Sequence, residues 1–240
     1  MKNQVGFLGL IFALSVLLLG SVQAAEPGSG NVSISPALDV TAGSSGTWTI
    51  EYTCTTPFAN GNLIVTIPPG WTLPQGSVPN GAGYVTVSSN DPACNPTIAA
   101  INGQAIDIGV DNLGKQKKIF VVYGDDSDGA NPSARAVAQL NAGPNVPFII
   151  DSDPDDGKDP RPNPSLSFLN ITAGPPHHLT ISPSGTTISA DDFVSFTITV
   201  VDTNDNRTPL TENRTFFLAS TPSGHFYLTS NHSTPITTIG

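Results

Sequence analysis

The chain has 240 residues and a net charge of −10, with 19 acidic side chains, 9 basic ones, 23 glycines and 22 prolines. This acidic balance argues against a nucleic-acid-binding protein, because Lys and Arg side chains must neutralise the phosphates. The glycines and prolines divide the chain into short segments, which argues against a fold built on long helices.

The first 24 residues have the pattern of a secretory signal peptide. Lys2 supplies the positive charge, an apolar run extends from Val5 to Leu19, and small residues end at Ala24. The apolar run is shorter than the about 20 residues that a membrane span needs. We therefore predict a secreted or cell-surface protein with no transmembrane segment in the mature chain. The alternative is an uncleaved N-terminal anchor.

Apolar and polar side chains alternate with a period of two through residues 25–173. Within Thr47–Cys54, the side chains of Trp48, Ile50 and Tyr52 share one face, which is typical of a half-buried strand. Turn clusters separate such runs without intervening helical periodicity, so we predict an all-β fold of antiparallel β-sandwich type, with a closed barrel as the alternative. Further runs of this kind include Leu63–Ile67, Tyr84–Val87, Ile106–Val110, Ile119–Tyr123 and Ala136–Leu140.

The two cysteines, Cys54 and Cys94, lie 40 residues apart. In an exported chain such a pair most simply forms one disulfide bond. Closing this loop would stabilise the fold by about 4 kcal/mol in the chain-entropy model. The alternative is a pair of free or metal-binding thiols, although no His or Cys stands at the spacing of a zinc site. We predict a Cys54–Cys94 bond that joins a loop to the end of a strand.

Trp71 is the candidate ligand-binding residue, with a carbohydrate as the ligand. It follows Pro68-Pro69-Gly70 at the end of an alternating run, and an exposed aromatic ring at such a turn can stack on a sugar. The alternative is core packing, because large aromatic side chains beside a strand end are usually buried.

Five carboxylates stand in the nine residues from Asp151 to Asp159. Calcium ions prefer six to eight oxygen ligands, and an Asp-x-Asp-x-Asp order supplies several of them. The segment is not an EF-hand, because Asp156 replaces the required glycine and Pro162 replaces the bidentate glutamate. We predict either a looser extracellular calcium loop, with Ca²⁺ as the only cofactor indicated, or a solvated acidic loop. The candidate metal ligands are Asp151, Asp153, Asp155 and Asp159.

A domain boundary is expected at residues 172–178, where Pro175 and Pro176 stop a strand. Alternation then resumes, so we expect a sandwich module over residues 25–173 and a second Ig-like domain over residues 174–240. This gives two Ig-like antiparallel β-sandwich domains in tandem. Because a complete sandwich takes about 100 residues, we expect the second domain to be incomplete in this chain.

Two stretches of the second unit carry a family pattern. Gly174-Pro175-Pro176 leads into Leu179-Thr180-Ile181, and the strand ending at Val201 continues in a Val-x-Asp-x-x-x-Asn order through Asp202 to Asn206. This order resembles the opening of a bacterial Ig-like domain of the invasin and intimin type. More loosely, the first unit resembles β-rich modules of large bacterial surface proteins. The resemblance implies stacked modules that space or present an adhesive tip, and it implies no catalytic chemistry.

The motifs of common enzymes are missing from the sequence. It contains no Gly-x-Ser-x-Gly elbow, no His-Glu-x-x-His helix and no phosphate-binding glycine loop. His177 and His178 are adjacent, so in an extended strand their side chains point to opposite sides and do not share a metal. We interpret them as solvent-exposed linker residues and predict a protein that is not an enzyme.

These features together predict a non-enzymatic secreted or cell-surface protein whose Ig-like modules act as stalk and adhesion elements. Its partner would be an extracellular protein or glycan that the sequence does not name. Two alternatives stay open. One is the non-catalytic N-terminal region of a larger secreted hydrolase, and the other is a carbohydrate-binding module that uses Trp71 and Tyr84.

Overall fold

The regular elements of the structure are almost all strands. A computed structural model describes residues 28–37, 39–127, 132–155, 160–163, 165, 167–185, 194–210, 212–213, 215–217 and 238–239. Within these ranges the only helical element is the short 3-10 turn η1 (Pro132–Ala134), and no helix is long and apolar enough to cross a membrane. The all-β prediction is confirmed, whereas the predicted signal peptide lies outside the described residues.

One face of the sandwich is a four-stranded antiparallel sheet of order β1-β4-β9-β6. Buried residues alternate with half-buried ones along the whole of β4, as the sequence pattern predicts. The alternation arises because successive side chains of a strand point to opposite faces. The strands are β1 (Asn31–Ser35), β4 (Trp48–Thr53), β9 (Lys118–Tyr123) and β6 (Val85–Ser89).

The other face is a seven-stranded sheet of order β2-β13-β11-β5-β8-β7, with β12 paired to β11. All its pairs are antiparallel except β13 with β2. A two-residue ladder joins β3 (Ser45–Gly46) to β10 (Ala136–Val137). The strands of the large sheet are β2 (Val40–Thr41), β5 (Phe58–Thr66), β7 (Thr97–Asn102), β8 (Ala105–Leu113), β11 (Gly143–Asp153), β12 (Arg161–Pro162) and β13 (Ser167–Thr172).

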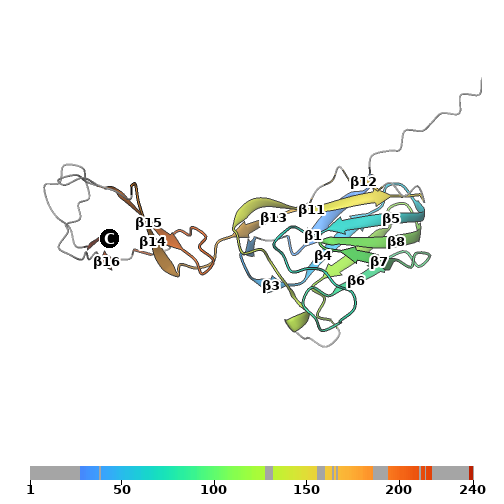
Figure 1. The fold of residues 1–240 in the computed structure, drawn as a ribbon. Helices are drawn as coiled ribbons and strands as arrows, with labels where there is room; N and C mark the ends of the chain where they lie inside the picture. Colours follow the sequence, from blue (N-terminus) through green and yellow to red (C-terminus); the bar gives the residue numbers. More distant parts are fainter. Residues whose placement is uncertain are drawn as a thin grey trace, which may run out of the picture.

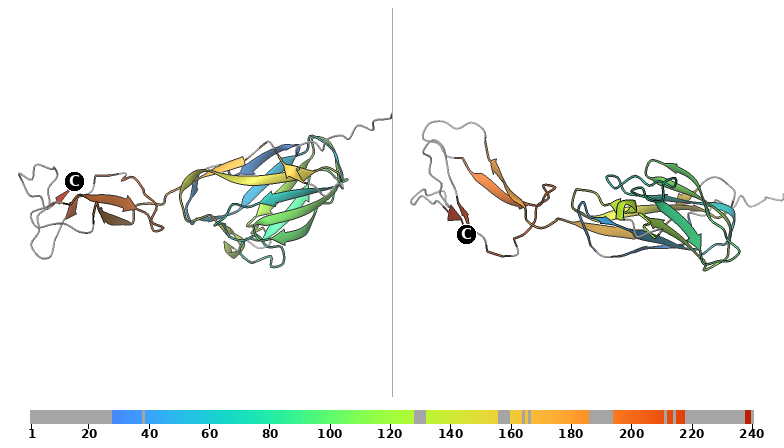
Figure 2. Two further views of the ribbon diagram at one scale, coloured as in Figure 1. Left: turned by 45° about the horizontal axis from the view of Figure 1, so that its top comes forward. Right: turned by 90° about the horizontal axis from the view of Figure 1, so that it is seen from below.

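The sheets of the sandwich lie over one another (Figure 2). A single apolar cluster fills the space between them. Ile50 and Tyr52 of β4 belong to it together with Leu63 of β5, Ile106 of β8 and Ile150 of β11, and each is almost completely buried. Because two separately ordered sheets share this core, the first unit is a sandwich and not a closed barrel.

Beyond β13 the chain continues into a second group of strands (Figure 1). β14 (His178–Pro183) and β15 (Phe196–Val201) form an antiparallel hairpin, and β16 (Phe216–Phe217) pairs with β17 (Thr238–Ile239). Within the hairpin, Ile181 and Phe196 are 56% and 49% exposed, whereas Val201 at the end of β15 is buried. The buried residues of this region therefore gather where β15 ends.

Candidate functional site

The loop after β15 is built around one buried carboxylate. Asp202 is completely buried, and its oxygens accept hydrogen bonds from the backbone N–H groups of Gly174 (2.7 Å), Asn204 (2.8 Å) and Asn206 (2.9 Å). The Asn206 side chain donates to the same carboxylate at 3.0 Å. An Asp that bonds its own downstream backbone is a common way to fix a turn. Here it also holds the chain entering the hairpin, at Gly174, to the chain leaving it.

The hydrogen bonds of Asp202 determine its charge. Burial alone disfavours an ionised carboxylate, but the bonds donated by the Asn206 side chain and by the backbone of Gly174, Asn206 and Asn204 outweigh it. They lower the pKa of Asp202 to about 2. At neutral pH the loop is therefore organised by a buried negative charge with a full set of donors.

Two asparagines of the same loop bind the backbone of the sandwich. The Nδ2 of Asn206 donates to the carbonyl of Leu140 at 2.7 Å, and its Oδ1 accepts from the N–H of Ala142 at 2.8 Å. The Nδ2 of Asn204 approaches the carbonyl of Ala42 at 3.4 Å. The amide of Asn206 thus pairs with the sandwich as a peptide group of a neighbouring strand would.

Thr208 adds a further connection, because its hydroxyl donates to the carbonyl of Gly174 at 3.0 Å. We use the term joint for Gly174, Asp202–Asn206 and Thr208 together with the sandwich backbone at Ala42, Leu140 and Ala142. Since backbone groups of the sandwich accept and donate these bonds, the joint connects the hairpin base to the sandwich through polar contacts.

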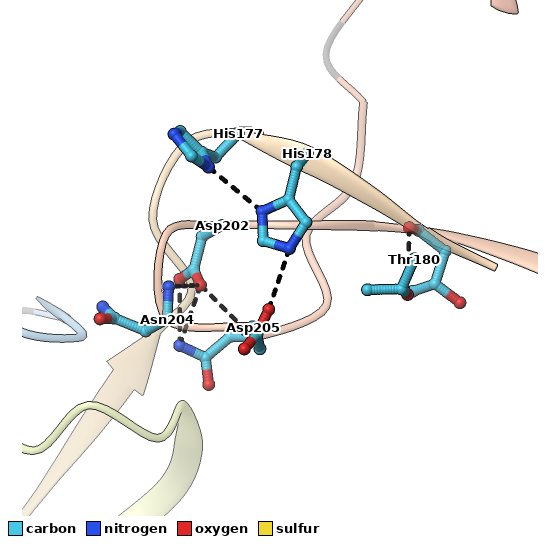
Figure 3. Close-up of polar contacts among 8 residues, drawn as sticks. His177, His178, Thr180, Asp202, Asn204 and Asp205 are labelled. Atoms are coloured by element: carbon cyan, nitrogen blue, oxygen red, sulfur yellow. Dashed lines mark hydrogen bonds and ion pairs between the residues drawn. The ribbon is translucent and has the colours of Figure 1, made fainter. Parts of the chain in front are cut away.

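A histidine pair lies on the outer side of the joint (Figure 3). The Nδ1 atoms of His177 and His178 are 3.1 Å apart, and the Nε2 of His178 lies 3.0 Å from Oδ1 of Asp205. The expectation that the two side chains point to opposite sides is wrong. β14 begins only at His178, so His177 precedes the strand and does not follow its alternation.

The predicted disulfide is not present in the structure. Cys54 and Cys94 are both buried free thiols. The Sγ of Cys54 donates to the carbonyl of Thr56 at 2.8 Å, whereas Cys94 interacts with Ser89 and Asp111. Each sulfur therefore has its own polar partners, and burial raises the pKa of each thiol to about 11.

Trp71 lies in the core and is only 4% exposed. Its ring meets Trp48 edge to face at a centroid distance of 4.7 Å and Phe148 at 5.3 Å. The packing alternative describes this residue correctly, since a ring enclosed by other aromatic side chains offers no face to a sugar.

The acidic segment is only partly described. Asp151 and Asp153 lie at the end of β11 and Asp155 follows them, but Asp159 lies outside the described residues. One oxygen of Asp151 is buried without a hydrogen bond, and burial raises the pKa of this carboxyl. In the described part of the chain no three His, Cys, Asp or Glu side chains converge as metal ligands. Calcium binding here stays a prediction.

No family model and no curated protein matches the chain. A solved structure to which it is similar is the non-cellulosomal cohesin from the hyperthermophilic archaeon Archaeoglobus fulgidus, with 10% identity, a TM-score of 0.30, and coverage of 60% of this chain and 92% of that chain. The resemblance of the second unit to invasin and intimin domains is not confirmed by these matches.

Proposed function

We propose that this protein is a non-enzymatic stalk and adhesion element of a secreted or cell-surface assembly. The observation that carries the proposal is the joint. The amide of Asn206 binds the sandwich backbone at Leu140 and Ala142, and the buried carboxylate of Asp202 holds the loop that presents this amide. A stalk must keep successive β-units at a fixed angle, and directional hydrogen bonds to backbone groups do this over a small contact area.

The composition of the joint also supports a spacer. A flexible linker is typically rich in Gly and Ser, and it leaves its backbone free to sample many conformations. In this chain the connection between β13 and β14 contains Pro175 and Pro176, and the N–H of Gly174 is bound to Asp202. Both features restrict motion between the sandwich and the β14–β15 hairpin.

Small-angle X-ray scattering on the secreted chain tests this function. We expect the wild type to scatter as one elongated rigid particle, and Asn206→Ala to show a broader range of particle dimensions. Asn213→Ala is the matched control, because Asn213 is exposed and lies outside the joint. A wild-type profile already as broad as that of Asn206→Ala would contradict a stalk function.

A further inference from the structure

The contact between the two histidines brings their Nδ1 atoms close together. The Nδ1 atoms of His177 and His178 are 3.1 Å apart, with ring planes at 90° to each other and both side chains exposed to solvent. A neutral imidazole has one protonated nitrogen and one with a free lone pair. The contact is therefore held by one shared proton in the metal-free protein, and two protonated Nδ1 atoms would repel each other.

The same spacing fits two ligands of one metal ion. Metal–nitrogen bonds to histidine are about 2.0–2.1 Å long, so two such ligands at angles between about 90° and 110° have nitrogens about 2.9–3.4 Å apart. The observed 3.1 Å lies inside that range. A small cation that replaces the shared proton would need little movement of either ring.

Asp205 supplies the outer partner that metal-binding histidines usually have. Its Oδ1 lies 3.0 Å from the Nε2 of His178, on the side of the ring away from His177. A carboxylate that accepts the Nε2 proton fixes the tautomer in which Nδ1 carries the lone pair. Asp205 is held in this place by a left-handed backbone with φ of 64°, within the loop that Asp202 organises.

We propose that His177 and His178 bind a divalent first-row transition-metal ion through their Nδ1 atoms, with Asp205 orienting His178 through its Nε2. Imidazole nitrogens suit copper, nickel and zinc, whereas calcium and magnesium prefer oxygen ligands. On binding, the proton shared between the Nδ1 atoms moves to the free Nε2 of His177, so that both neutral rings present an Nδ1 lone pair to the metal.

The site is open on its solvent side. Among the described residues no third His, Cys, Asp or Glu completes the ligand set, so water fills the other coordination positions. With two protein ligands, affinity should follow the Irving–Williams order, with Cu²⁺ bound more tightly than Zn²⁺.

Calorimetric titration of the full secreted chain, without an affinity tag, with Cu²⁺ and then with Zn²⁺ tests the proposal. We expect one equivalent of Cu²⁺ to bind per chain through the two Nδ1 atoms. His177→Ala and His178→Ala should each weaken binding at least tenfold, and Asp205→Asn should weaken it about tenfold, as for other outer-shell carboxylates. The double variant His225→Ala/His232→Ala is the matched control and should bind as the wild type does.

Electron paramagnetic resonance of the Cu²⁺-loaded wild type counts the ligands without any substitution. The proposal requires coupling to two imidazole nitrogens. Binding that survives in His177→Ala/His178→Ala, loss of binding in the His225→Ala/His232→Ala control, or a spectrum with fewer than two imidazole nitrogens would overturn it. Because His177 and His178 are exposed, their variants should keep the circular dichroism spectrum of the wild type.

Discussion

The sandwich and the joint are stabilised by different interactions. Between the sheets, the buried side chains are mostly apolar, and the largest include Tyr123, Phe148 and Ile50. At the joint, the completely buried side chain is the carboxylate of Asp202, and its neighbours bind by directional hydrogen bonds. Apolar burial stabilises a fold without fixing an angle, whereas a satisfied polar network selects one arrangement. Stability therefore resides mainly in the sandwich, and we propose that the joint sets the orientation of the hairpin.

The largest effect should come from the apolar core. Phe148→Ala removes a completely buried ring that packs on Trp71, and we expect it to lower the free energy of unfolding by about 3–5 kcal/mol. Denaturant unfolding measures this change. Phe168→Ala on the neighbouring strand β13 is the matched control, since Phe168 is 46% exposed and should cost little. Equal effects for the two variants would show that the sheets do not pack as described.

A smaller and more local effect is expected for Asp202→Asn. The substitution keeps the shape of the side chain but removes its negative charge. The carboxylate oxygens of Asp202 accept hydrogen bonds from the backbone N–H groups of Gly174, Asn204 and Asn206. We expect a loss of about 2 kcal/mol, confined to the joint and the β14–β15 hairpin. Native-state hydrogen exchange should show faster exchange at these three amides and unchanged protection in the sandwich.

Asp205→Asn is the control for this prediction, because Asp205 lies in the same loop but is exposed. It should leave the exchange of the joint amides nearly unchanged. If Asp205→Asn accelerated exchange as much as Asp202→Asn does, the buried carboxylate would not be the organising group.

Acid should weaken the joint through Asp202. The pKa of this carboxyl is lowered to about 2 in the folded protein, below its value of 3.8 in the unfolded chain. A carboxyl group whose pKa is lowered by folding stabilises the folded protein at pH values above its unfolded pKa. This stabilisation is lost as the pH falls through about 4 towards 2. The exchange of the joint amides in the wild type should therefore approach that of Asp202→Asn over this window. A difference between the two proteins that stays constant down to pH 2 would contradict this assignment.

The smallest effect concerns the thiols of the sandwich. Burial raises the pKa of Cys54 and of Cys94 to about 11, so neither forms much thiolate at neutral pH. We expect two thiols per chain to react slowly with a thiol reagent in the native protein and at once in denaturant. Denatured, unreduced protein that shows no reactive thiol would mean that the two cysteines are bonded.

The fold could be predicted largely from the sequence, because alternation is a local property. The run Thr47–Cys54 predicts the strand observed as β4, and its apolar face is the buried one. Proline and glycine clusters locate the breaks between strands. The pairing of β13 with β2 in parallel could not be foreseen, because register between distant strands depends on the complete packing of the sandwich.

The joint could be predicted only in part. The Val-x-Asp-x-x-x-Asn order marks Asp202 and Asn206, and Asp is a common turn residue. Their partners at Leu140 and Ala142 are backbone groups, which carry no sequence signature. The directions of the two histidine side chains were predicted wrongly, because the alternation of a strand was applied to His177, one residue before β14 begins. The predicted Cys54–Cys94 bond is not found in the structure, where both thiols are free, and it stays a prediction that the thiol titration tests.

The central claim is that the Asn206 amide fixes the hairpin relative to the sandwich. Pulsed electron spin resonance between labels at Ser88→Cys on β6 and Ser182→Cys on β14 measures this directly, since both positions are exposed and the native cysteines are buried. We predict one narrow distance distribution with Asn206 present and a broad one after Asn206→Ala. A broad distribution in the chain that retains Asn206, or an unchanged narrow one after the substitution, would contradict the claim.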